Sequence, residues 1–150
     1  MTKVMFVCHG NICRSTMAEF VLKHLVAQKG CAADFLIASS ATSREEIGSD
    51  THPGTRRKLK SVGIATPPRC AVQLTAVDYE KYDHFFAMDS ANLTNMRRIL
   101  GGDPTGKIRR LLDLTDRSGN IADPWYTGNF DATYEDVVAG CEAFLNSLHK

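Results

Sequence analysis

The sequence predicts an α/β fold in which a parallel sheet is covered by helices. Short apolar runs alternate with segments whose apolar residues recur at helical spacing, and this alternation is typical of βαβ units. The 150 residues contain no repeat, low-complexity tract or linker, and their number suits one domain with its own core. We therefore expect a single domain spanning residues 1–150.

The same patterns place the strands and helices. Apolar runs predict strands at 3–7, 35–39, 84–88 and 108–112. Helical patterns are found at about 14–29, 54–62, 90–100 and 134–148, with a shorter turn at 76–81. The stretch from about 103 to 133 is rich in Gly, Asp, Asn and Pro, which predicts a long functional loop. In such folds ligands bind beyond the carboxyl ends of the strands.

The most informative segment is the loop after the first strand. Residues 8–15 read C-H-G-N-I-C-R-S, so Cys8 ends the strand and Arg14 opens the next helix. A helix start presents free backbone N–H groups and the positive end of the helix dipole, which attract anions. Gly10 and Asn11 can adopt the positive φ angles that curl a loop around an anion. These surroundings favour a Cys8 thiolate, which predicts a nucleophile aimed at a bound phosphate.

Composition argues against several other classes of function. The net charge of +1 and the lack of a long apolar run give no reason to expect a nucleic acid or membrane partner. Five cysteines without the spacing of a disulfide framework predict reduced thiols in a cytoplasmic protein. Cys8, His9 and Cys13 lie close together, but no second pair of metal ligands exists in the sequence. We therefore expect no metal site and no cofactor.

Two motifs carry a resemblance to a known family. The C-x5-R-S loop at residues 8–15 is similar to the phosphate-binding loop of the low-molecular-weight protein tyrosine phosphatases. Far along the chain, D-P-W-Y at 123–126 resembles the second element of that family, an Asp-Pro followed by aromatic residues. The resemblance covers essentially all 150 residues, including S-S-A-T-S at 39–43 and A-M-D-S-A-N at 87–92. It implies a four-stranded parallel sheet with helices on both faces, a three-layer fold of the flavodoxin-like or Rossmann-like kind.

The resemblance also implies a role for each residue of the two motifs. Cys8 would attack phosphorus and form a cysteinyl-phosphate, while Arg14 would hold two phosphoryl oxygens with its planar fork. Ser15 would hydrogen-bond the sulfur and ease its departure. Asp123 would act first as a general acid and then as the base that activates water. The phosphate-binding residues would be His9, Gly10, Asn11, Ile12, Cys13 and Arg14.

The expected substrate is a phosphotyrosine-containing protein or a small aryl phosphate. Trp125 and Tyr126 would form the walls of a slot for a phenyl ring, and Ile12 favours an aromatic phosphomonoester over phosphoarginine, because related arginine phosphatases usually carry Thr there. Glu45 and its neighbour Glu46 lie where many family members place an aromatic rim residue, and carboxylates there would disfavour acidic peptides. We further expect inhibition by phosphate-like oxyanions and a monomer or weak dimer.

Three features of the site depart from this reading or add to it. Thr16 replaces a Pro that is usual after the serine, with little expected effect. The buried histidine that supports the loop in the family has no clear counterpart near Pro68 and Arg69, so loop rigidity would come from elsewhere. Cys8 and Cys13 share the loop, and the resemblance implies that oxidants could join them in a reversible disulfide.

Two alternatives share this loop and fold. A thiol-dependent arsenate reductase would need a further pair of redox cysteines near the exit of the third strand, and residues 84–92 contain none. A phosphate-binding module without turnover would be expected to have lost Cys8, Arg14 or Asp123, and all three are present. The sequence therefore favours a protein-tyrosine phosphatase, a phosphoric monoester hydrolase, over both.

Overall fold

Four parallel strands form the central layer of the computed structural model, which describes residues 1–148. The strand order is β2 (Phe35–Ala41), β1 (Thr2–Cys8), β3 (His84–Ala87) and β4 (Ile108–Arg110). β1 pairs with β2 on one side and with β3 on the other, so Val4 lies opposite both Ile37 and His84. The connection after β1 leads to β2 on one side of it, and the connection after β2 leads to β3 on its other side. The strand order therefore reverses at β1, so the carboxyl end of β1 at Cys8 is a topological switch point.

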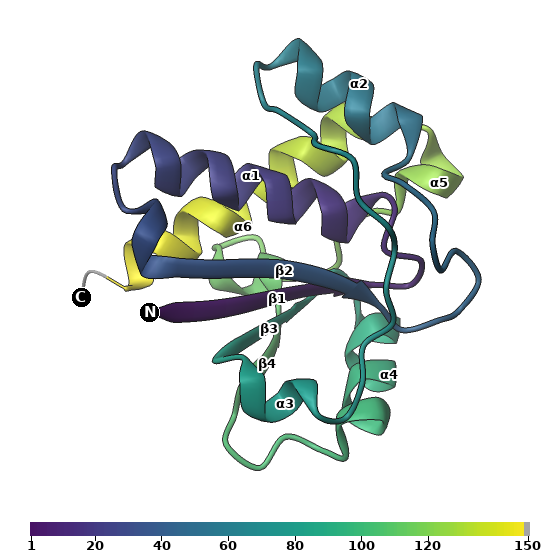
Figure 1. The fold of residues 1–150 in the computed structure, drawn as a ribbon, viewed down its shortest axis with the longest axis vertical. Helices are drawn as coiled ribbons and strands as arrows, with labels where there is room; N and C mark the ends of the chain where they lie inside the picture. The colour runs from purple at the N-terminus through teal and green to yellow at the C-terminus, as the bar shows by residue number, and fades with distance from the viewer. Residues whose placement is uncertain (149–150) are drawn as a thin grey trace.

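Helices cover both faces of this sheet, giving three layers (Figure 1). α1 (Arg14–Gln28) and α6 (Phe130–Ser147) pack together on one face, with α2 (Pro53–Ser61) against them. α3 (Asp78–Lys81) and α4 (Ser90–Leu100) lie on the other face. Three short helices complete the described chain: η1 (Ala32–Asp34), η2 (Leu111–Leu114) and α5 (Pro124–Thr127). Within residues 1–148, none of the helices is long and apolar enough to cross a membrane.

Successive side chains of a strand point to opposite faces of the sheet, so one hydrophobic core forms under each helical layer. Phe6 and Phe86 point to the α1–α6 side, where their rings stack with centroids 5.8 Å apart. Met5 and Phe85 point to the opposite side, in the cluster that also contains residues of α3 and α4. Since β1 is buried between the two layers, its carboxyl end is held rigidly from both faces.

The predicted parallel α/β fold is confirmed, with two corrections near the end of the chain. The fourth strand was predicted to extend to residue 112, but it ends at Arg110 and η2 follows. The side chain of Asp113 accepts hydrogen bonds from Arg110 and from the N–H of Gly119, which turns the chain away from the sheet. α6 begins four residues before the predicted position, because Asn129 caps it by accepting from the N–H of Ala132.

The predicted long loop at 103–133 is therefore interrupted by several short elements. It contains β4, η2 and α5, and the first turn of α6. Its polar composition reflects caps and turns between these elements, because glycines and Asx residues favour such positions. The D-P-W-Y motif spans the start of α5, which Asp123 caps.

Candidate active site

The loop at residues 8–14 lies at the carboxyl end of β1 and leads directly into α1. Asn11 has φ 58°, and it is the one residue other than glycine with a positive φ among those described. This left-handed backbone, which was predicted, bends the loop back over the start of α1. Cys13 occupies the N-cap position of α1 without a side-chain cap, so no side chain competes for the first amides of the helix. The loop therefore has the form of an anion cradle.

The sulfur of Cys8 faces a hydroxyl group in the first turn of α1. Cys8 is buried, and its Sγ lies 3.0 Å from Ser15 Oγ. Ser15 Oγ also accepts a hydrogen bond from Asn11 Nδ2 at 2.8 Å. The hydroxyl hydrogen is then available for the sulfur, so Ser15 can stabilise a thiolate there.

Arg14 is held at the centre of the site by acceptors from distant parts of the chain. Its side chain is only 3% exposed. Nη1 donates to Asp89 Oδ2 at 2.7 Å and to the carbonyl oxygen of Ile121 at 2.9 Å. Nη2 lies 3.5 Å from Asp123 Oδ2. The guanidinium group is thus fixed between two carboxylates, beside the loop at residues 8–14.

Asp123 enters the site from the start of α5. Its backbone is extended, with φ −83° and ψ 114°, a conformation that the following proline favours. Its Oδ1 accepts from the N–H of Trp125 at 3.0 Å and caps the helix, while Oδ2 faces Arg14. One carboxylate oxygen therefore fixes the side chain and the other is directed at the pocket.

A single pocket brings the predicted residues together. Trp125 and Tyr126 stand at its mouth, with 57% and 83% of their surface exposed. Opposite the D-P-W-Y segment, Glu45 and Glu46 come from the loop after β2, and His9 Nε2 lies 2.9 Å from Glu45 Oε2. The pocket is lined by Cys8, His9, Gly10, Ile12, Cys13, Arg14, Glu45, Glu46, Asp123, Trp125 and Tyr126. Asn11 and Ser15 lie behind this lining, where they support the loop instead of facing the pocket.

The thiol of Cys13 differs from that of Cys8 in its surroundings. Burial, and secondarily the nearby Cys8, raise the pKa of Cys13 to about 12. Cys13 therefore stays protonated at neutral pH and does not compete as a nucleophile. All five cysteines are free thiols in this structure.

Three residues support the site in a way that the sequence alone did not reveal. Asp89 Oδ1 caps α4 by accepting from the N–H of Asn92, and Asp89 Oδ2 accepts a hydrogen bond from Arg14. Its position just after β3, the neighbour of β1, was the signal that could have revealed it. His52 donates its backbone N–H to Ile12 O at 2.8 Å, and its ring lies edge-on to Trp125 with centroids 5.7 Å apart. Burial lowers the pKa of His52, which keeps its ring neutral at neutral pH.

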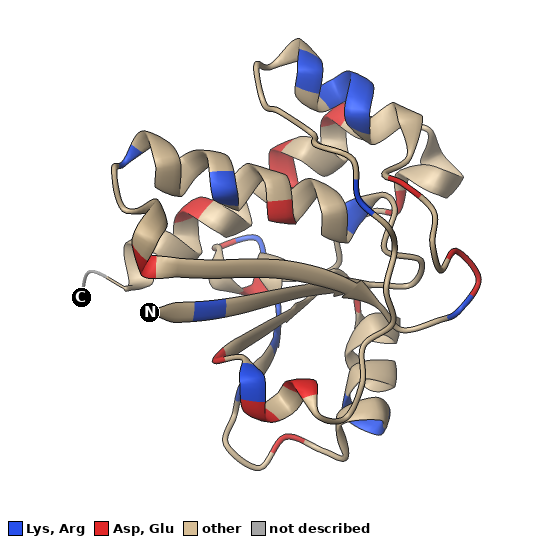
Figure 2. Cartoon of the chain, viewed as in Figure 1, with Lys and Arg blue, Asp and Glu red and all other residues tan. Residues whose placement is uncertain are grey.

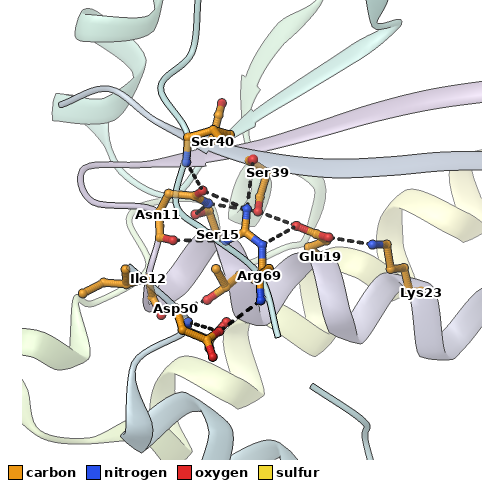
Figure 3. Close-up of polar contacts among 12 residues, drawn as sticks. Asn11, Ile12, Ser15, Glu19, Lys23, Ser39, Ser40, Asp50 and Arg69 are labelled. Atoms are coloured by element: carbon orange, nitrogen blue, oxygen red, sulfur yellow. Dashed lines mark hydrogen bonds and ion pairs between the residues drawn. The ribbon is translucent and has the colours of Figure 1, made fainter. Parts of the chain in front are cut away.

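The third missed residue is Arg69. The supporting histidine of the family was expected to have no counterpart near Pro68 and Arg69, with loop rigidity coming from elsewhere. Residue 69 is an arginine, but it does support the loop, because its guanidinium group contacts Asn11 directly (Figure 3). No sequence signal distinguishes Arg69 from a solvent-exposed arginine, because its partner lies 58 residues away.

Within residues 1–148, no group of three or more His, Cys, Asp or Glu side chains is arranged to hold a metal ion. The chemistry available in the pocket is therefore that of a thiol, a guanidinium group and a carboxyl group at the mouth of an anion-binding loop.

Comparison with known proteins points to one family. The model of the family "Low molecular weight phosphotyrosine protein phosphatase" matches residues 3–150. The chain is 38% identical to the low molecular weight protein-tyrosine-phosphatase YfkJ of Bacillus subtilis, covering 100% of this chain and 97% of YfkJ. The crystal structure of YfkJ superposes with a TM-score of 0.94 over 99% of this chain and 95% of YfkJ. The crystal structure of SP-PTP, a low molecular weight protein tyrosine phosphatase from Streptococcus pyogenes, superposes with a TM-score of 0.89 at 40% identity. The match covers 99% of this chain and 93% of SP-PTP. The chain therefore belongs to the low-molecular-weight phosphotyrosine protein phosphatase family.

Proposed function

We propose that residues 1–150 form a single phosphatase domain that hydrolyses phosphotyrosine and other aryl phosphomonoesters through a cysteinyl-phosphate. The observation that carries this proposal is the convergence of Cys8, Arg14 and Asp123 in one pocket, although Asp123 comes from the far end of the sequence. Family membership supports the same activity.

In the first step, the phosphate group binds the amides of the loop at residues 8–14 beside Arg14. The Cys8 thiolate attacks phosphorus, so an S–P bond forms while the P–O bond to the phenol breaks. Asp123, initially protonated, gives its proton to the leaving phenolic oxygen. Arg14 and the loop amides stabilise the charge on the equatorial oxygens, which is the main source of catalysis in phosphoryl transfer.

In the second step, water replaces the phenol. Asp123, now a carboxylate, takes a proton from the water as its oxygen attacks phosphorus. The S–P bond breaks, and the Cys8 thiolate leaves with the Ser15 hydroxyl group hydrogen-bonded to it. Release of inorganic phosphate restores the starting state, so the cycle consumes only water and the ester.

The depth of the pocket favours aromatic esters. The reactive sulfur is buried, while Trp125 and Tyr126 project at the mouth, so a phenyl ring spans this distance and a serine side chain does not. We expect phosphotyrosine proteins or small aryl phosphates as substrates and phosphate-like oxyanions as inhibitors. Five free thiols suit a reducing cytoplasm, and a monomer or weak dimer stays the expected state.

Steady-state hydrolysis tests this function. The wild-type protein should hydrolyse p-nitrophenyl phosphate in the presence of a chelator, with a bell-shaped profile between about pH 4 and 8 that reflects one base and one acid. It should prefer a phosphotyrosine peptide to phosphoserine or phosphoarginine peptides. Phosphate binding without turnover would instead support the binding module, and arsenate-dependent oxidation of thiols would support the reductase.

The acidic rim gives a prediction about peptide sequence. Acidic residues lie in the loop between β2 and α2 (Figure 2), and among them Glu45 and Glu46 line the pocket. A phosphotyrosine peptide with Lys or Arg beside the tyrosine should have a kcat/KM about 3- to 30-fold higher than one with Asp or Glu there, because exposed pairs contribute about 0.2–1 kcal/mol each. Competition between matched basic and acidic peptides, measured at low and high salt, tests this.

A matched pair of variants assigns the preference to the rim. The double variant Glu45→Gln/Glu46→Gln should reduce the ratio of the two kcat/KM values toward one. Glu80→Gln removes a carboxylate from α3, on the opposite layer, and should leave the ratio as in wild type. A ratio that does not change in the rim variant would contradict selection by Glu45 and Glu46.

The redox pairing of Cys8 with Cys13 stays a prediction. Both thiols are reduced in the structure and both line the pocket. A disulfide between them would need an oxidant such as a peroxide, which takes up the two electrons that the thiols release.

A further inference from the structure

Arg69 supports the phosphate loop from behind. It comes from the segment between α2 and α3, and its side chain is 16% exposed. Nη1 donates to the carbonyl oxygen of Asn11 at 3.2 Å, and Nη2 donates to Asn11 Oδ1 at 2.9 Å. One planar fork therefore holds both the backbone and the side chain of the residue whose left-handed conformation shapes the loop.

A buried carboxylate fixes the guanidinium group in turn (Figure 3). Glu19 of α1 is 7% exposed, and its Oε1 lies 3.7 Å from Arg69 Nε. The same oxygen accepts a hydrogen bond from Ser39 Oγ, and Lys23 Nζ donates to Oε2 at 2.6 Å. Glu19 keeps Lys23 as a second partner, but removing Glu19 would leave the largely buried guanidinium group of Arg69 without this carboxylate, so Glu19 helps to hold it in one arrangement.

The Asn11 amide has every hydrogen-bonding position occupied. Oδ1 accepts from Arg69 and from the N–H of Val72, at 2.9 and 3.2 Å. Nδ2 donates to Ser15 Oγ at 2.8 Å and to Ser39 Oγ at 2.9 Å. A guanidinium group can only donate, and it stays protonated throughout the working range of pH. It therefore requires Oδ1 on its own side, as the weaker donor Val72 N–H also does, and this places Nδ2 toward Ser15.

The orientation of the Asn11 amide determines whether Ser15 can donate a hydrogen bond to Cys8. Because Ser15 Oγ accepts from Asn11, its own hydrogen can be donated to Cys8 Sγ, 3.0 Å away. A reversed amide would place an acceptor at Ser15 and draw its hydrogen away from the sulfur.

We propose that Arg69 is a positioning residue that sets the direction of the hydrogen bonds from Asn11 through Ser15 to Cys8, so that Ser15 donates to the sulfur. The proposal rests on the function proposed above. It adds that a cation outside the pocket governs the reactivity of the thiolate, both when it attacks and when it leaves.

The test compares Arg69→Gln and Arg69→Lys with wild type. Glutamine can present its amide in either direction, so Arg69→Gln should lower kcat for p-nitrophenyl phosphate about 10- to 100-fold, as small misplacements of reacting groups do. KM should change less than kcat. Alkylation of Cys8 by iodoacetate, which needs the thiolate and is followed by mass spectrometry, should require a higher pH than in wild type. Lysine can only donate, so Arg69→Lys should recover much of both properties.

Arg56→Gln is the matched control. Arg56 and the backbone N–H of Arg69 both contact Asp50, but the contacts of Arg56 do not include the loop at residues 8–14. This control should match wild type in kcat and in its iodoacetate profile. If Arg69→Gln does not fold, Arg69→Met replaces it, because a thioether has similar length but no hydrogen to donate to Asn11.

A double-mutant cycle tests the route through Asn11. In an Asn11→Ala background, Arg69→Gln should have little further effect on kcat or on alkylation. Equal effects in both backgrounds, or a folded Arg69→Gln with a wild-type iodoacetate profile, would overturn the proposal. Alkylation does not depend on turnover, so an inactive wild type would refute the phosphatase function while the profile still tests the positioning role.

Discussion

Replacement of Cys8 by serine is expected to abolish turnover of p-nitrophenyl phosphate while leaving oxyanion binding in place. The serine hydroxyl has nearly the size of the thiol, but it does not ionise near neutral pH and is a far weaker nucleophile. The loop amides and Arg14 remain, held by Asp89 and Ile121. We expect kcat to fall by at least about 10⁴-fold, as when the nucleophile of a covalent mechanism is removed.

Two measurements make this prediction specific. Titration with vanadate or phosphate should show that Cys8→Ser still binds the anion, so the loss is in chemistry and not in folding. Cys31→Ser, which alters a half-buried cysteine at the N-cap of η1, serves as the control and should retain wild-type kcat. Substantial turnover by Cys8→Ser would contradict the cysteinyl-phosphate mechanism and would indicate direct attack of water on phosphorus.

The fold was predictable where apolar patterns are local. The strands at residues 3–7 and 35–39 follow from buried runs, and their parallel pairing follows from the helix between them. The end of β4 and the start of α6 were wrong because side chains decide them. Asp113 turns the chain after Arg110, and Asn129 starts a helix at a place where composition suggests a loop. Such caps depend on single hydrogen bonds that no periodicity reveals.

The site likewise has a part that local sequence predicts and a part that depends on tertiary contacts. Residues 8–15 form one continuous motif, so the nucleophile, the left-handed Asn11 and the helix start could be predicted together. Asp89 and Arg69 could not, because each reaches the loop through a tertiary contact across 75 or 58 residues. The long side chain of Arg69 spans a distance that sequence spacing does not encode. These supporting residues decide how the loop is held, and they are the part that required a structure.

Asp123→Asn is expected to lower turnover of phosphotyrosine far more than that of an ester with a good leaving group. Asparagine can still accept the N–H of Trp125, so the cap of α5 and the shape of the pocket should survive. It cannot donate or take up a catalytic proton, and loss of a general acid typically costs about 10²–10⁴-fold. A leaving group that departs as a stable anion needs no proton, so its first step should be slowed least.

The dependence on the leaving group therefore identifies the role of Asp123. A series of aryl phosphates with increasingly basic phenols should show single-turnover rates that fall steeply in Asp123→Asn and only weakly in wild type. Asp131→Asn removes an exposed carboxylate that pairs with Lys58, outside the pocket, and should behave like wild type. A uniform loss across the series would mean that Asp123 acts on Arg14, 3.5 Å away, instead of on the leaving oxygen. A steep dependence would place the proton transfer at the ester itself, because an effect on binding does not vary with the basicity of the phenol.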